Sequence, residues 1–200
     1  YFKKRQSDFS KAEEDWKKLF DDYAKKQPEK YGELISYFDE AAVAKKISSV
    51  DFPVYAEGDS VSTRVASGKA LNAVAKKFAA LVGGSADLEG SNCTKLENEA
   101  YFSPADYAGK SIHFGIREFA MAAICNGIAL HKPLHPFCAT FLIFSDYLKP
   151  ALRLSALMKL PVIYVLTHDS IYVGEDGPTH QPIETIAMLR SVPNCYVFRL

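Results

Sequence analysis

The chain has 200 residues, of which 48% are hydrophobic and 24% charged, which is ordinary for a soluble globular protein with one good core. Its 24 basic and 24 acidic residues balance, so bulk charge favours neither nucleic acid nor an anionic membrane as a partner. No apolar run reaches transmembrane length, and the charged N-terminus is unlike a signal peptide.

The first 50 residues are rich in charge and indicate helices over 9–23 and 31–44. The break at 51–53 contains a proline and ends this pattern. We therefore expect a solvated helical appendage over 1–50 and a separate domain over 51–200. The chain begins without Met and stops just after a strand-like run, as a piece of a longer protein would.

From residue 60 onward, helical and strand-like patterns alternate, which is typical of a parallel sheet covered by helices on both faces. Ser62 or Thr63 is expected to cap the first helix. The helix over 117–130 is nearly all apolar and is expected to be buried, as is the strand over 161–166 on both faces. The expected helices are 63–78, 117–130, 142–158 and 182–190, and the expected strands are 81–85, 112–114, 133–139, 161–166 and 195–199, with an irregular stretch at 92–109.

The four cysteines have no CxxC spacing, which makes metal and disulfide roles improbable. Two of them lie in apolar runs, so buried reduced thiols in a cytoplasmic protein are the expected state. The cysteines are Cys93, Cys125, Cys138 and Cys195.

A polar loop over 167–182 follows the apolar strand at 161–166. It leaves the carboxyl end of that strand, where open α/β sheets place their ligands. Two histidines and three carboxylates are gathered in it, between glycines that allow tight bends and prolines that stiffen the backbone. This loop is the first candidate for a functional site.

The loop sequence THDSIYVGEDGPTHQP closely resembles the corresponding segment of transketolases, which use thiamine diphosphate. Four further segments resemble that family in the same order along the chain. They are STRVASG at 62–68, GGSADL at 83–88 with Ser91, Asn92 and Thr94 behind it, GIREFAM at 115–121, and TFLIFSDY at 140–147 followed by RLSAL at 153–157.

The resemblance implies the end of a first domain with its linker, then most of the pyrimidine-binding domain. It also implies a transferase of the pentose phosphate pathway. Such an enzyme reversibly moves a two-carbon ketol group from a ketose phosphate to an aldose phosphate.

Glu118 begins an apolar helix, where its position alone is typical of an acid favoured by the helix dipole. The resemblance implies a catalytic role: the family's Glu hydrogen-bonds the cofactor aminopyrimidine and promotes its imino form. Apolar neighbours would raise the pKa of this carboxyl and help it to hold a proton. Phe119 replaces the His that often follows this Glu in the family.

Phe141, Phe144 and Tyr147 are spaced by three residues, which by itself is typical of a core-facing helical stripe. The resemblance implies that they form a flat pocket for the aminopyrimidine ring. Cys138 and Ala139 stand where the family commonly has two glycines. Asp87 matches a family Asp near the cofactor at the subunit boundary, although a turn residue explains it equally well.

Arg64, Ser91, His168 and Arg199 have counterparts around the substrate phosphate in the family. Each has a plain surface interpretation when taken alone. The guanidinium fork matches phosphate oxygens, and histidine can donate to an oxyanion near neutral pH. The resemblance therefore assigns these four residues to the sugar phosphate.

Asp176 and His180 are assigned by the resemblance to the sugar hydroxyls and carbonyl near the reacting carbon, where they would take part in catalysis. Lone histidines are more often structural, but here two share a ligand-positioned loop with carboxylates. Function is therefore the favoured interpretation.

The Gly-Asp-Gly segment and downstream Asn that hold diphosphate and metal in the family do not occur in this chain. The ligands of Mg²⁺ or Ca²⁺ are therefore expected outside it, in a homodimer whose site is shared between subunits. Two rival interpretations are a 1-deoxyxylulose-5-phosphate synthase-like enzyme and a non-catalytic subunit that kept the fold. The chain taken alone is expected to be inactive.

Overall fold

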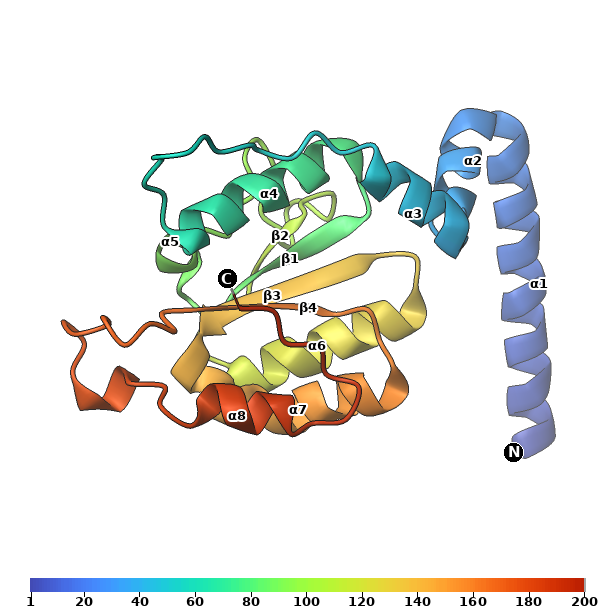
Figure 1. The fold of residues 1–200 in the computed structure, drawn as a ribbon. Helices are drawn as coiled ribbons and strands as arrows, with labels where there is room; N and C mark the ends of the chain where they lie inside the picture. The colour runs from blue at the N-terminus through green and yellow to red at the C-terminus, as the bar shows by residue number, and fades with distance from the viewer. Residues whose placement is uncertain (200) are drawn as a thin grey trace. The chain divides into compact units, whose positions relative to one another are not determined.

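A computed structural model describes residues 1–199 of the chain, which form two compact units, Tyr1–Ala44 and the part from Lys45 onward (Figure 1). The division into a linker over 1–50 and a domain over 51–200 remains a prediction. Among the described residues, no helix combines the length and apolar character that crossing a membrane requires.

The first unit is helical, and its first two helices pack against each other. Trp16 stacks on Phe20 with ring centroids 4.9 Å apart, and Phe20 meets Tyr31 of the second helix edge-on at 5.2 Å. The helices near this end of the chain are α1 (Phe2–Lys26), α2 (Pro28–Ser36) and α3 (Glu40–Ser48).

The prediction of a single helix over 31–44 was wrong. The chain leaves the helix after Ser36 and starts another at Glu40. Asp39 explains the new start, because its Oδ1 accepts a hydrogen bond from the backbone N–H of Ala41 at 2.9 Å. Such a contact satisfies one of the free donors at the beginning of a helix.

The second unit is a parallel α/β domain, as predicted. Its four strands lie in the order β2-β1-β3-β4, and each neighbouring pair is parallel. The strands are β1 (Leu81–Ser85), β2 (Ser111–His113), β3 (His135–Phe141) and β4 (Ile163–Thr167).

Helices cover both faces of this sheet: α4 lies over one face, and α6, α7 and α8 lie over the other (Figure 1). The helix α5 contacts β1, β3 and β4. The helices are α4 (Thr63–Lys77), α5 (Glu89–Asn92), α6 (Glu118–His131), α7 (Ser145–Met158) and α8 (Thr185–Arg190), with 3₁₀ turns η1 (Leu142–Phe144) and η2 (Pro178–His180).

The main core lies between the sheet and the α6–α7–α8 layer. Met121, Cys125 and Leu148 are fully buried there, as is Cys138 of β3. Cys125 and Cys138 were expected to be buried, and both are free thiols within this core.

Two glycines let β1 sit between its neighbours. A Cβ atom on Gly83 would lie 2.0 Å from the carbonyl oxygen of Phe137, and one on Gly84 would lie 2.0 Å from that of Ile112. Neither distance is tolerable against backbone atoms. The close approach of three strands therefore requires glycine at both positions.

Several local expectations were wrong. Residues 195–199 form no strand, and β4 is thus the edge of the sheet, with Ile163 50% exposed instead of buried. The helix α6 is buried on one face only, since Phe119 and Ile124 are about half exposed. Ser62 is the N-cap residue of α4, but its side chain makes no capping hydrogen bond.

Candidate active site at the carboxyl edge of the sheet

The predicted site residues converge on one edge of the sheet. The four strands are parallel, so their last residues, Ser85, His113, Phe141 and Thr167, lie toward the same edge. Asp87, Glu118, Phe144 and His168 follow these strand ends within a few residues along the chain. The topology therefore places the candidate residues where parallel α/β sheets bind ligands.

His168 is the centre of this arrangement. It directly follows β4 with a positive φ of 58°, an uncommon conformation for a non-glycine residue. Its ring stacks on Phe141 with centroids 3.8 Å apart. Its Nε2 atom lies 3.2 Å from Nη1 of Arg64, which comes from the first turn of α4.

Arg64 also reaches α5, where the carbonyl oxygen of Ser91 lies 3.4 Å from the same Nη1 atom. The close packing of α4 on this part of the chain depends on Gly68, because a Cβ atom there would lie 2.3 Å from the carbonyl oxygen of Cys93. Arg64, Ser91 and His168 are thus brought together from three segments.

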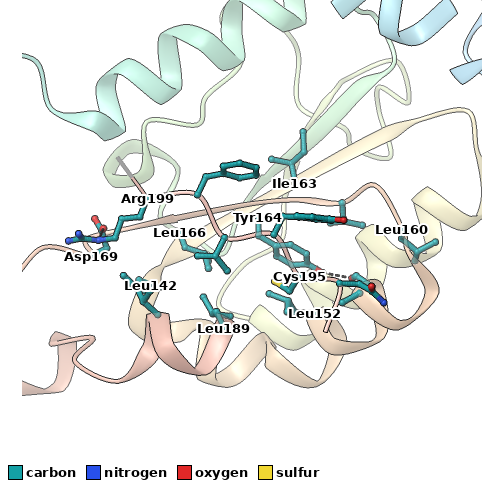
Figure 2. Close-up of a pocket in the computed structure, with 18 residues that line it drawn as sticks. Leu142, Leu152, Leu160, Ile163, Tyr164, Leu166, Asp169, Leu189, Cys195 and Arg199 are labelled. Carbon is teal, nitrogen blue, oxygen red and sulfur yellow. Dashed lines mark hydrogen bonds and ion pairs between the residues drawn. The ribbon is translucent and has the colours of Figure 1, made fainter. Parts of the chain in front are cut away.

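Arg199 is held nearby by a different contact. Its Nε atom donates to Oδ2 of Asp169 at 2.8 Å, and Asp169 directly follows His168. Both side chains lie at one end of an apolar groove of about 380 Å³ lined by β4, α7, α8 and the segment after α8 (Figure 2). Apart from this ion pair, the groove is mostly apolar, and Arg199 is the one predicted site residue among the described residues that line it.

The three predicted aromatic residues form a stack along η1 and the start of α7. Phe141 and Phe144 are nearly parallel, at 7° with centroids 5.8 Å apart. Phe144 and Tyr147 are 6.0 Å apart at 29°. Phe141 is buried, whereas Tyr147 is 63% exposed, so the stack runs from the core to the surface. It therefore differs from a core-facing helical stripe.

The loop after β4 folds back over this stack. His180 meets Phe144 edge-on at 5.2 Å and Phe141 at 6.1 Å. Asp176 is exposed in the same loop and acts electrostatically on His168. His168 and His180 thus lie against the aromatic stack, and Asp176 belongs to the same loop.

Glu118 is the first residue of α6 and is only partly buried. The fully apolar surroundings expected for its carboxyl are therefore incomplete within this chain. Asp87 is exposed between β1 and α5 and has a positive φ of 61°, as suits a short polar residue in a turn. Both residues therefore lie near the carboxyl edge of the sheet.

A buried polar network beneath the site was not assigned a role from the sequence. Asn92 is fully buried; its Oδ1 accepts from Ser85 Oγ at 2.6 Å, and its Nδ2 donates to Thr167 Oγ1 at 2.7 Å. Thr167 Oγ1 in turn lies 2.9 Å from Nδ1 of His168. One sequence signal could have revealed this network. Two strands that otherwise consist of apolar residues and glycine each end in a polar residue.

The pKa of His168 lies below its ordinary value. Partial burial is the main cause, and the positive charge of Arg64 adds to it. Asp176 and Asp169 oppose this shift, while His180 reinforces it. The neutral imidazole is therefore the form favoured near neutral pH in the unliganded protein.

The fold and the location of these residues define an open α/β domain with its ligand site at the carboxyl edge of a parallel sheet. Residues 59–200 match the family model described as "Transketolase, pyrimidine binding domain". The chain therefore belongs to this family.

Individual relatives agree with this assignment. The transketolase of Halalkalibacterium halodurans is 52% identical over 201 residues, covering all of this chain and 30% of the relative. That of Bacillus subtilis is 50% identical over 192 residues, covering 94% of this chain and 28% of the relative. The chain thus spans about 30% of the length of the curated relatives it matches.

Solved structures show the same fold. A transketolase from Pichia stipitis in complex with sedoheptulose-7-phosphate superposes with a TM-score of 0.83 at 41% identity, covering 94% of this chain and 28% of that one. The transketolase of Leishmania mexicana gives a TM-score of 0.80 at 38% identity, covering 92% of this chain and 27% of that one.

Proposed function

We propose that this chain is the pyrimidine-binding part of a transketolase. The complete enzyme would reversibly transfer a two-carbon ketol group from a ketose phosphate to an aldose phosphate. The observation that carries this proposal is the meeting of Arg64, His168 and the aromatic stack at one edge of the sheet. A guanidinium and an imidazole beside a flat aromatic surface suit a phosphorylated substrate next to a heteroaromatic cofactor.

Thiamine diphosphate is the proposed cofactor, and the residues present fit its pyrimidine ring. Phe141, Phe144 and Tyr147 offer a nearly parallel aromatic surface, and Glu118 offers a carboxyl at the same edge. When bound, the cofactor supplies a carbon nucleophile that can attack a ketose carbonyl. Glu118 would hold a proton against a ring nitrogen, and the aromatic residues would orient the ring and exclude water.

The substrate phosphate is proposed to bind Arg64, Ser91, His168 and Arg199. Arg64 and His168 are already adjacent, and Arg199 is anchored one residue further along through Asp169. Asp176 and His180 would contact the hydroxyls and the carbonyl of the sugar. Their loop lies against the aromatic stack through His180, which supports a position near the reacting carbon.

A second subunit is proposed to complete the site. The diphosphate of the cofactor, together with Mg²⁺ or Ca²⁺, would be held by residues outside this chain, in a homodimer. Large apolar side chains remain exposed on α6 and α7, which pack side by side, and such surfaces favour association. The exposed residues on these helices include Phe119, Ile124, Leu130, Tyr147, Leu154 and Leu157.

A 1-deoxyxylulose-5-phosphate synthase-like enzyme is not favoured, because the relatives described above are transketolases. We further propose that the enzyme acts in the cytoplasm, within the pentose phosphate pathway.

The proposed reaction can be tested on the enzyme that contains this chain. With thiamine diphosphate and Mg²⁺, it should convert a ketose phosphate and an aldose phosphate into the pair that differs by two carbons. Condensation of pyruvate with an aldose phosphate would instead support the synthase-like alternative. Failure to turn over either pair would support a non-catalytic subunit.

A further inference from the structure

A continuous chain of hydrogen-bonding groups runs from the interior of the sheet to the surface of the candidate site. It connects Ser85 of β1, Asn92 of α5 and Thr167 of β4, and it ends on His168. Ser85, Asn92 and Thr167 are 3%, 0% and 6% exposed, so water cannot easily substitute for any of these contacts. Buried networks of this kind are strongly constrained in geometry and in proton placement.

The surface end of this network determines where the proton of His168 lies. The guanidinium of Arg64 has donors only, so Nε2 of His168, 3.2 Å away, must act as the acceptor. A neutral imidazole then carries its proton on Nδ1. That N–H donates to Oγ1 of Thr167 at 2.9 Å.

This assignment does not depend on the orientation of the Asn92 amide. If Asn92 donates to Thr167, the two lone pairs of the hydroxyl oxygen accept from Asn92 and from His168. If the amide were reversed, the Thr167 hydroxyl would donate to Asn92 and still accept from His168. In both cases Thr167 accepts from Nδ1 while Arg64 donates to Nε2, so the two contacts favour the same tautomer.

We propose that Asn92 and Thr167 are positioning residues that hold His168 as its Nδ1–H tautomer, and that a phosphate group bound between Arg64 and His168 therefore takes up one proton. The second part rests on the phosphate-binding role proposed above. A phosphate dianion presents only lone pairs, and so does Nε2. As long as the proton stays on Nδ1 against Thr167, a proton must lie between them, either on Nε2 or on the phosphate oxygen, and it comes from the solvent. If the Thr167 hydroxyl turned to donate to Nδ1, the proton of the imidazole would lie on Nε2 instead and no proton would be taken up.

The charged groups around His168 allow this uptake. Arg64 from α4 and His180 from η2 disfavour a proton on His168, whereas Asp176 and Asp169 in the loop after β4 favour it. Asp169 is partly neutralised by its ion pair with Arg199. A bound dianion would offset the charge of Arg64, which removes the main electrostatic opposition to the imidazolium.

The tautomer can be observed without any ligand. We would label the histidines of the 200-residue chain with ¹⁵N, assign His168 with a His168→Gln variant, and record long-range ¹H–¹⁵N correlations at pH 7.5. A protonated Nδ1 and an unprotonated Nε2 are expected. Thr167→Ser should keep this pattern, whereas Thr167→Val should raise the fraction protonated on Nε2. A predominant Nε2–H form in the unmodified chain would overturn the assignment.

The proton uptake can be measured with ethyl phosphate, titrated by NMR into the same chain between pH 7 and 8.5. The second pKa of a phosphate monoester is about 6, and the pKa of His168 is lowered from 6.5. Both groups are therefore unprotonated before binding. Because the complex holds one more proton, the affinity should fall about tenfold for each pH unit above 7.

The two proposals fail in different ways. Saturable binding that weakens in Arg64→Ala but does not change with pH would overturn the proton uptake and leave the phosphate site standing. Absence of binding, or binding that Arg64→Ala leaves unchanged, would overturn the phosphate site together with the uptake. The tautomer of His168 would remain a separate result, read from the unliganded spectra.

Discussion

Nη1 of Arg64 lies 3.2 Å from Nε2 of His168, although the two residues are 104 positions apart in the sequence. The same nitrogen lies 3.4 Å from the carbonyl oxygen of Ser91. Three segments of the chain therefore meet around one guanidinium before any ligand binds. Preorganisation of this kind lowers the cost of ordering a site when its ligand arrives.

Removal of the Arg64 guanidinium should affect phosphorylated substrates selectively. A charge-assisted contact contributes about 1.5–3 kcal/mol. We therefore expect Arg64→Ala in the complete enzyme to lower kcat/KM for a phosphorylated sugar by roughly tenfold to a hundredfold. The unphosphorylated sugar should be nearly unaffected. Steady-state kinetics with the two sugars provides the comparison, and Arg64→Lys should recover part of the loss.

Arg199→Ala should show the same selectivity, since Arg199 is anchored beside His168 through Asp169. Asp176→Ala is the matched control, because its proposed contacts are with the sugar and should matter for both substrates. Equal losses for the two sugars in both arginine variants would contradict the phosphate assignment.

His168 should make the stability of the chain depend on pH in a defined direction. Its pKa is lowered in the folded state, so below about 6.5 the unfolded state binds more protons. The free energy of unfolding should therefore fall as the pH drops from 6.5 through the folded-state pKa. His168→Gln should make this dependence shallower in urea titrations at pH 7.5, 6.5 and 5.5. An unchanged slope would argue against a partly buried, Arg64-facing imidazole.

Gly84 should be intolerant of even a methyl group. A Cβ atom there would lie 2.0 Å from the carbonyl oxygen of Ile112, so Gly84→Ala should lower the free energy of unfolding by about 1–3 kcal/mol or more. Gly90 in α5 is the matched control, because nothing lies within 4 Å of a Cβ atom there. Gly90→Ala should cost nothing in the same denaturant titration. Similar losses in both variants would show that the strand packing around Gly84 is looser than described.

The sequence predicted most of the fold because its signals were local. The strand at 81–85 was predicted with its observed bounds, since an apolar run followed by turn residues is sufficient to define it. Residues 195–199 also looked like a strand but do not pair with β4. A strand forms only where a neighbouring strand offers unpaired backbone N–H and C=O groups, and a local sequence pattern does not show whether such a neighbour exists. Ile163 is exposed for the same reason, since no strand formed by 195–199 pairs with β4.

The candidate site was predicted in a similarly uneven way. The resemblance named Arg64, Ser91 and His168, and the structure brings them together. The pairing of Asn92 with Thr167 joins residues 75 positions apart and could not be read from either segment alone. The exposure of one face of α6 was also not predicted, because a run of apolar residues does not show which face of a helix is buried.

The central claim, that Glu118 and the aromatic stack serve the pyrimidine ring of thiamine diphosphate, is tested most directly by hydrogen–deuterium exchange at the thiazolium C2 position. The measurement would compare the complete enzyme with its Glu118→Gln variant, both saturated with cofactor. We predict that the variant still binds the cofactor but exchanges this proton at least about a hundredfold more slowly, within the range of general acid–base contributions. An unchanged exchange rate at full cofactor occupancy would contradict the account.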